Sequence, residues 1–334
     1  MNEKERLLKV LKGESVDRPP VICPGGMMSA CVTEILEDIE ENHNLDYKAM
    51  ARASRKIYDL AGFENYGVPF AMIVEAEPLG AKVQIGNKEV EERVIEYNNE
   101  PLEEIMGKYT VVPFKEYRMK VVLDAIKELK NDSVPVIGNI TGHISTATSA
   151  VDPLGILKML RKEPERAYSF FKYINSYLIE YAKEIIKAGA DVIAISDPTA
   201  TGEILGGKNF EKFAVPLYKE LIDVIHSYNI PVIVHICGNA KTIVHGLNMI
   251  GADALSFDSM VNMRYAKANI TTRLMGNVST QLLHTGEKEK IVSITKNCID
   301  SGVDIVSPAC GLSMATSVEN LKTMTDYVKK GKYI

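Results

Sequence analysis

The stretch Gly189-Ala-Asp-Val-Ile-Ala-Ile-Ser-Asp-Pro198 contains three structural signals in succession. A glycine follows a helical pattern, a short apolar run follows an aspartate, and polar residues follow the run. Glycine suits the left-handed backbone position that ends many helices, and short apolar β-branched runs favour buried strands. The stretch therefore predicts a helix end, a buried strand and a polar loop at the carboxyl end of that strand.

The same order of residues recurs at Gly251-Ala-Asp253 and Gly302-Val-Asp304. Strand and helix patterns alternate along most of the chain, which is typical of a single-domain (β/α)8 TIM barrel over residues 1–334. A doubly wound sheet is the alternative, but no Gly-x-Gly-x-x-Gly turn follows any strand pattern. The expected strands are 20–23, 66–73, 134–139, 191–195, 230–235, 253–257, 273–277 and 304–307.

Three further local patterns complete the expected architecture. Residues 2–12 predict an amphipathic helix that precedes the barrel, and residues 80–97 predict a hairpin insertion apart from the main sheet. The pattern Thr316-Ser-Val-Glu319 predicts a capping box at the start of the last helix.

Composition narrows the class of protein. The chain has 334 residues, of which 46% are hydrophobic, so it can bury a large core. The net charge of −5, without a basic block, argues against a nucleic-acid partner. No apolar run approaches the roughly 20 residues of a membrane-spanning helix, and the charged start Met1–Arg6 does not resemble a signal peptide. Five cysteines in such a chain predict a cytoplasmic protein without a disulfide framework.

Candidate metal ligands lie at two strand ends. His235 and Cys237 close the strand expected at 230–235, and they point the same way because side chains alternate along a strand. Alone, the pair is more typical of a core histidine beside a buried cysteine. Cys310 follows another strand, however, and histidine nitrogen with cysteine sulfur is the donor set that zinc prefers. His235, Cys237 and Cys310 therefore predict a catalytic zinc site with one position open for substrate.

Asp258 leaves the strand that follows the His-x-Cys strand, and two interpretations stay open for it. It can be a carboxylate that begins a turn or caps a helix. It can also be a displaceable fourth zinc ligand or a hydrogen-bond partner of His235.

Other polar residues near strand ends are candidates for binding a cofactor or substrate at the barrel mouth. Each of them also fits an ordinary turn or loop. The candidates for cofactor binding are Asn139, Asp197, Glu75 and Asn277; Glu77 can line the barrel mouth beside Glu75, and His143 is a further candidate in the loop after the strand expected at 134–139.

Several of these motifs together resemble one enzyme family, the methylcobamide:coenzyme M methyltransferases of the uroporphyrinogen decarboxylase superfamily. The resemblance extends from Asp17-Arg-Pro-Pro20 through the last helix. It is carried by His235-Ile-Cys-Gly-Asn239, Cys310-Gly311, Ala190–Pro198 and Met275-Gly-Asn-Val-Ser279.

The resemblance implies a (β/α)8 barrel that holds Zn²⁺ through His235, Cys237 and Cys310, with Asp258 as the fourth ligand. It implies a methylated corrinoid (methylcobamide) protein as the methyl donor and a small thiol such as coenzyme M as the acceptor. Because a free cysteine-type thiol has a pKa of about 8.5, zinc is needed to keep the acceptor ionised. The sulfur then attacks the methyl group of methyl-Co(III) and releases Co(I).

Three alternatives remain beside this function. Relatives within the branch can pass the methyl group to another thiol or to tetrahydrofolate. Uroporphyrinogen decarboxylases carry an arginine-rich Met-Arg-Gln-Ala-Gly-Arg stretch, whereas Cys23-Pro-Gly-Gly-Met-Met-Ser29 has no arginine here. A module that binds a corrinoid protein without catalysis is the third alternative.

Overall fold

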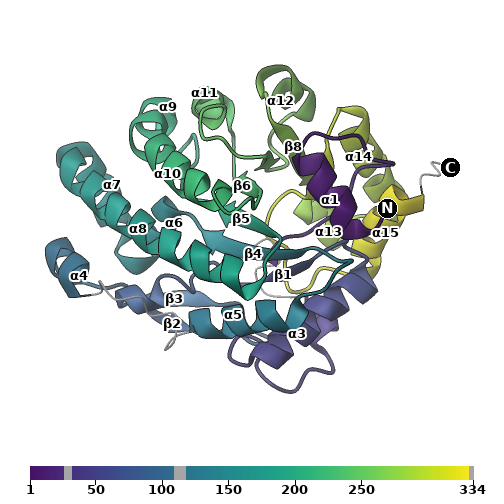
Figure 1. Ribbon diagram of the computed structural model, residues 1–334, viewed down its shortest axis with the longest axis horizontal. Helices are drawn as coiled ribbons and strands as arrows, with labels where there is room; N and C mark the ends of the chain where they lie inside the picture. Colours follow the sequence, from purple (N-terminus) through teal and green to yellow (C-terminus); the bar gives the residue numbers. More distant parts are fainter. Residues whose placement is uncertain (26–31, 109–117, 331–334) are drawn as a thin grey trace.

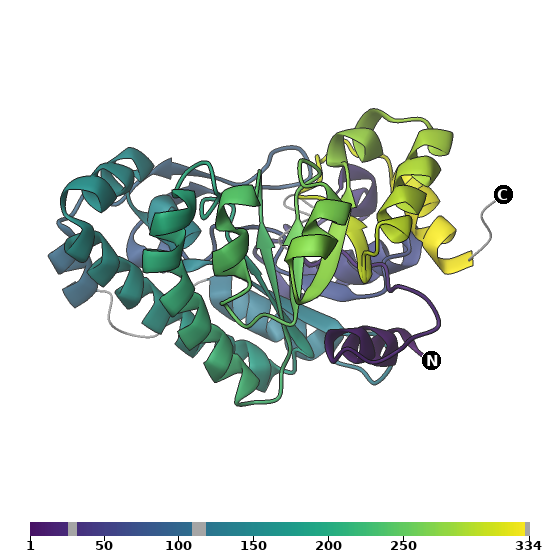
Figure 2. The ribbon, with the colours of Figure 1, turned by 90° about the horizontal axis from the view of Figure 1, so that it is seen from above.

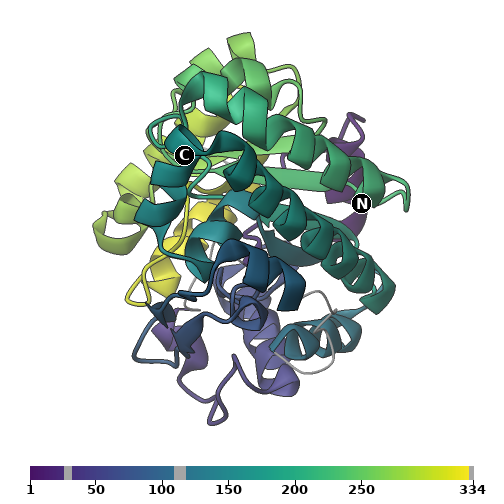
Figure 3. The ribbon, with the colours of Figure 1, turned by 90° about the vertical axis from the view of Figure 1, so that its left-hand side faces the viewer.

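The computed structural model describes residues 1–25, 32–108 and 118–330. Within them, seven parallel strands form one curled sheet in the order β1-β4-β5-β6-β7-β8-β9, with helices around its outer side (Figure 1). Seen from the left of that view, the teal and green helices of the middle of the chain lie in front of the strands (Figure 3). The strands are β1 Tyr66–Val68, β4 Val136–Thr141, β5 Val192–Ser196, β6 Val232–Ile236, β7 Ala254–Phe257, β8 Arg273–Val278 and β9 Ile305–Pro308.

The helices between the strands bury their apolar sides against the sheet. In α10, for example, Leu217 and Leu221 are buried, as the helical spacing of their apolar neighbours predicts. The first and last helices, α1 and α15, lie on the same side of the molecule (Figures 1 and 2). The α-helices are α1 Glu3–Leu11, α2 Thr33–Leu36, α3 Tyr47–Lys56, α4 Leu102–Lys108, α5 Arg118–Leu129, α6 His143–Ala150, α7 Pro153–Lys162, α8 Pro164–Ala188, α9 Gly206–Asn209, α10 Val215–His226, α11 Val244–Leu247, α12 Met263–Asn269, α13 Thr280–Thr285, α14 Lys288–Asp300 and α15 Val318–Lys330. Short π-helical turns at η2 Ile57–Ala61 and η4 Phe210–Ala214, and 3₁₀ turns at η3 Glu77–Leu79 and η5 Lys241–Ile243, complete the elements.

Among the described residues, none of the helices has the length and apolar character needed to cross a membrane.

The repeated Gly-x-Asp pattern has a structural cause. The three glycines end helices or turns with φ of +112°, +83° and +87°, in the left-handed region that glycine tolerates, as predicted: Gly189, Gly251 and Gly302. Each aspartate accepts a hydrogen bond from a backbone N–H near the start of the preceding strand: Asp191 from Val136 at 2.9 Å, Asp253 from Val232 at 2.7 Å and Asp304 from Leu274 at 2.8 Å. The repeat therefore ties neighbouring strands together at their amino ends, away from the strand ends that carry the polar residues.

The first expected strand, at 20–23, is reduced to one bridge. Val21 pairs in parallel with Val306 of β9, and Ile22 donates to the Val306 carbonyl at 3.0 Å. On its other side, the Val21 carbonyl accepts the N–H of Glu64 at 2.8 Å. The segment therefore lies between β9 and the residues that precede β1.

Two features explain why this segment does not form a longer ladder. Proline has no backbone N–H, so Pro19 and Pro20 cannot donate to a neighbouring strand. Two residues beyond the bridge, the side chain of Asn65 binds both the N–H and the carbonyl of Cys23, at 2.9 and 3.0 Å. A side chain thus replaces the backbone partner that a strand would have had.

Two other expectations about element ends were wrong. The strand expected at 66–73 ends at Val68, because Pro69 cannot donate to the ladder. The last helix begins at Val318, later than the capping box requires, and the buried Thr316 hydroxyl has no hydrogen-bond partner in the described structure.

The hairpin insertion is present as predicted. Strands β2 (Lys82–Gln84) and β3 (Arg93–Glu96) pair antiparallel in a separate two-stranded sheet. Arg118, at the start of α5, donates from Nε to Glu77 at 2.6 Å and also pairs with Glu92 at the base of β3. This buried arginine fastens the hairpin to the main body.

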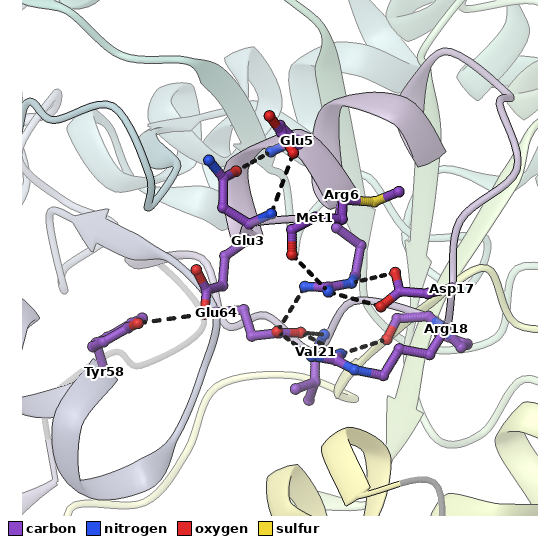
Figure 4. Close-up of polar contacts among 11 residues, drawn as sticks. Met1, Glu3, Glu5, Arg6, Asp17, Arg18, Val21, Tyr58 and Glu64 are labelled. Atoms are coloured by element: carbon purple, nitrogen blue, oxygen red, sulfur yellow. Dashed lines mark hydrogen bonds and ion pairs between the residues drawn. The ribbon is translucent and has the colours of Figure 1, made fainter.

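A buried ionic cluster holds the N-terminal helix to the sheet (Figure 4). The fully buried carboxylate of Glu64 accepts hydrogen bonds from Arg6 at 3.2 Å, from Arg18 at 2.8 and 2.6 Å, and from the Val21 N–H at 2.9 Å. Arg6 also donates twice to Asp17, at 2.9 Å each, and this hydrogen bonding lowers the pKa of Asp17 to about 2. Asp17 and Arg18, in the motif at residues 17–20, thus help to hold the 20–22 segment against the rest of the chain.

Candidate metal centre

Three side chains converge at the carboxyl ends of β6 and β9. His235 lies in β6, Cys237 directly follows it, and Cys310 follows β9. Their ligand atoms lie within 4.8 Å of one another, with His235 Nε2 3.2 Å from Cys237 Sγ and the two sulfur atoms 3.2 Å apart. One imidazole nitrogen and two sulfurs at one point are a donor set that fits zinc. Because β7 and β8 separate β6 from β9 in the sheet, only its curvature allows this meeting.

The imidazole of His235 is oriented by a hydrogen bond on the side of the ring that faces away from the two sulfur atoms. Its Nδ1 lies 3.0 Å from the hydroxyl oxygen of Ser256, which stands directly opposite it on β7. A ring proton on Nδ1 can therefore be donated to Ser256, which leaves the Nε2 lone pair facing the sulfur atoms. Ser256 was not a candidate from the sequence. The sequence offered one indication of this role. Ser256 lies near the end of its strand, two residues before Asp258, as His235 lies near the end of the neighbouring strand.

The two thiols differ in acidity because they share one hydrogen bond. That bond lowers the pKa of Cys310, with a smaller contribution from His235, and burial opposes the effect. The same bond, followed by burial, raises the pKa of Cys237. The cluster therefore favours at least one thiolate, which is the form that binds metals.

Asp258 lies beside the cluster but is not one of its three members. Its Oδ2 accepts the N–H of Gly238 at 3.3 Å, and its Oδ1 accepts the N–H of Met260 at 3.0 Å. The carboxylate thus joins the loop that follows Cys237 to its own loop. In this arrangement Asp258 has the turn role, one of the two interpretations that the sequence left open. Its partner Gly238 directly follows Cys237, a member of the cluster.

Asn277 supports the same loop. Its side-chain amide donates to the carbonyl oxygens of Asp258 at 2.9 Å and of Val261 at 2.8 Å, and its Oδ1 accepts the thiol of the buried Cys298 at 3.5 Å. The structure therefore gives Asn277 a role in holding the 258–261 loop, and its amide group is fully used in doing so.

Asp197 is buried at the start of α6. It accepts hydrogen bonds from the Ser145 N–H at 2.8 Å, the Ser145 hydroxyl at 2.6 Å and the Tyr218 hydroxyl at 2.8 Å. Burial raises the pKa of Asp197, and these hydrogen bonds oppose the rise. Its carboxylate caps α6 from the end of β5, so its observed contacts are structural. His143, the first residue of α6, is also fully buried, and neither ring nitrogen has a partner among the described residues.

Asn139 lies within β4, two residues before its end rather than at the end as expected, and Glu75 contacts the last residue of that strand. Glu75 accepts the N–H and the hydroxyl of Thr141, both at 2.9 Å, and so occupies the place that β1 leaves when it ends early. Burial raises the pKa of Glu75 to about 7. The Oδ1 of Asn139 accepts the hydroxyl of Ser196 at 3.1 Å, whereas its buried Nδ2 has no partner in the described structure. Of the four candidates for cofactor binding, Asn139 alone keeps a free donor.

The chain belongs to the uroporphyrinogen decarboxylase (URO-D) family, whose model matches residues 2–331. Within it, the chain is 30% identical over 338 residues to the methylcobamide:CoM methyltransferase MtbA of Methanosarcina acetivorans, covering 99% of this chain and 98% of that one. A solved methyltransferase from Methanosarcina mazei superposes with a TM-score of 0.91 at 27% identity, covering 99% of both chains. A uroporphyrinogen decarboxylase from Chlorobaculum parvum is 26% identical over 81% of each chain. The resemblance stated from the sequence is confirmed, and these relatives support an enzymatic methyltransferase role.

The hydrogen bond from His235 to Ser256 can be tested by Ser256→Ala. Removing the hydroxyl frees the imidazole to rotate, and zinc affinity is expected to fall by about 10–100-fold, as is common when such an outer partner of a metal ligand is lost. Competition with a chromophoric chelator measures the affinity directly. Ser256→Thr retains the hydroxyl and should restore most of the affinity. An affinity unchanged in Ser256→Ala would contradict the assigned role.

Proposed function

We propose that this chain is a zinc-dependent methyltransferase that moves a methyl group from a methylated corrinoid protein to a small thiol of the coenzyme M class. The observation that carries the proposal is the convergence of His235, Cys237 and Cys310 within 4.8 Å. Full-length relatives named as methylcobamide:CoM methyltransferases support the choice of donor and acceptor.

The residues of the chain have distinct tasks in this function. His235, held by Ser256, offers Nε2 to the metal, and Cys237 with Cys310 offers two thiolates. When bound, zinc supplies the positive charge that keeps an acceptor thiol ionised near neutral pH. Transfer would also require the loops around the cluster to orient the acceptor sulfur toward the incoming methyl group. A new C–S bond forms, the Co–C bond breaks, and its electron pair stays on cobalt, which is reduced from Co(III) to Co(I).

We also propose that the curled sheet is a closed (β/α)8 barrel forming one domain. The contacts of Val21 with Val306 and with Glu64 on opposite sides support a closing segment between β9 and β1. Limited proteolysis should therefore not release two stable halves, and two halves that each fold alone would contradict a single domain.

The decarboxylase alternative requires no metal, and no described contact favours it over methyl transfer. Residues 26–31, which include most of the stretch that lacks the decarboxylase arginines, lie outside the described part of the chain. The deciding experiment combines elemental analysis of purified protein with a methylcobalamin–thiol assay. About one zinc per chain and formation of a thioether are expected. Metal-free protein without methyl transfer would reject the function.

The proposed role of Asp258 as a displaceable fourth ligand has its own test. One oxygen of its carboxylate must turn toward the metal, away from the N–H of Gly238 or of Met260 that it accepts in this structure. X-ray absorption of zinc-loaded protein should then show one oxygen or nitrogen neighbour replaced by sulfur when thiol is added, since the softer thiolate displaces the carboxylate. Asp258→Ala should retain zinc, with water in the fourth position. A sulfur count that stays at two after saturation with thiol would contradict this role.

A further inference from the structure

A polar groove of about 920 Å³ lies beside the loop that follows β7. One wall is formed by this loop and the start of α12, and the other by α13 and α14. Figures 1 and 2 show α12 and α14 on the opposite side of the molecule from α7. The polar residues facing the groove include Ser259, Asn262, Arg264, Gln281, Lys290 and Asn297.

The wall of this groove is linked to the candidate metal centre by hydrogen bonds. Asp258 joins the Gly238 N–H at 3.3 Å to its own loop, and Asn277, on the groove floor, holds the carbonyls of Asp258 and Val261. Met260, in the same loop, is 68% exposed, the largest exposed fraction among the large apolar side chains described. An exposed apolar side chain therefore lies two residues from Asp258.

The groove also carries positive charge without internal partners. Arg264 and Lys290 are exposed and form no ion pair within 4.0 Å among the described residues, although many other surface cations do. One carboxylate, that of Glu287, lines the groove as well. Two cations and one carboxylate therefore line the groove, so its local charge is positive although the whole chain has a net charge of −5, and this favours an acidic partner.

We propose that Met260, Arg264 and Lys290, together called the β7-loop face, form the docking surface for the methylated corrinoid protein, which contacts them with acidic side chains around its cobalt face. This inference rests on the proposed function, because the methyl-cobalt group must reach a sulfur held at the cluster. A protein that delivers it covers about 800 Å² of this chain, so its contacts must extend onto loops beside the metal centre. Methionine and arginine are both enriched in protein–protein interfaces relative to the rest of a protein surface.

Comparing two methyl donors distinguishes a loss of docking from a loss of the methyl-transfer reaction itself. The protein donor is the methylated corrinoid protein that gives the fastest transfer with the wild-type chain, chosen from a panel of purified corrinoid proteins reconstituted with methylcobalamin. The second donor is free methylcobalamin, which needs no protein surface. With the protein donor, Met260→Glu and the double variant Arg264→Glu/Lys290→Glu are each expected to lower kcat/KM by about tenfold or more. With free methylcobalamin, both variants should match the wild type.

The controls lie on α7. Leu154→Glu changes an apolar side chain with a similar exposed fraction, 65%, and Arg161→Glu/Lys162→Glu makes the same charge change on exposed residues. Both controls should behave as the wild type with both donors. Raising the salt concentration should slow the reaction with the protein donor. The slowing should be larger for the wild-type enzyme than for the charge-reversed double variant.

Several outcomes would overturn the docking surface. The first is an equal loss of kcat/KM with both donors, and the second is a wild-type kcat/KM for the variants with the protein donor. The third is a panel in which no corrinoid protein gives faster transfer than free methylcobalamin. The fourth is a change in oligomeric mass caused by the variants, which would assign the face to a second copy of this chain. Failure of the wild-type enzyme with free methylcobalamin and thiol would instead reject the proposed function itself.

Discussion

Cys310→Ala is expected to remove stoichiometric zinc and to abolish methyl transfer to the thiol acceptor. The variant keeps only two of the three converging donors, and its zinc affinity should fall by more than about 100-fold, since losing a ligand costs more than losing an outer partner. Cys237→Ala should behave in the same way, because its sulfur lies 3.2 Å from that of Cys310. Elemental analysis after dialysis and the methylcobalamin–thiol assay measure the two effects.

A matched control comes from Cys298, the other cysteine in the second half of the chain. Cys298 is buried on α14 and, within the described part of the chain, donates only to Asn277, so Cys298→Ala should keep both zinc and activity. Circular dichroism should show the secondary structure of all three variants intact, because each substitution removes only one sulfur atom. Zinc content at the wild-type level in both Cys237→Ala and Cys310→Ala would reject the three-residue site.

Glu64→Ala is expected to lower the free energy of unfolding by about 3–5 kcal/mol, the usual effect of removing one partner from a buried ion pair. The carboxylate is fully buried and serves Arg6, Arg18 and the Val21 N–H, so its loss leaves two guanidinium groups without their shared acceptor. Urea denaturation followed by circular dichroism measures the change.

The control for Glu64 is Glu41→Ala, which removes an exposed carboxylate paired with the exposed Arg52. Such surface pairs contribute at most about 1 kcal/mol. If the two variants lost the same stability, the buried cluster would have no special role in attaching the N-terminal segment.

Local sequence patterns determined most of the elements. Glycines at left-handed positions, short β-branched runs and helical apolar spacing depend on residues that are close in the chain, so Gly189, Gly251 and Gly302 marked their turns correctly. The same locality explains the errors. The early end of β1 at Val68 and the single bridge at Val21 depend on prolines and on the side chain of Asn65, which competes with a strand more than 40 residues away in the sequence.

By itself, the sequence therefore determined the alternation of strands and helices, the family resemblance and the residue types able to hold a metal. Only the tertiary structure decided which polar residues face one another. Curvature of the sheet brings Cys310 to Cys237, strand register sets Ser256 behind His235, and burial assigns Asp197 to capping α6. These contacts join residues far apart in the chain, and their energies depend on burial and on hydrogen-bond partners, neither of which exists until the strands have paired.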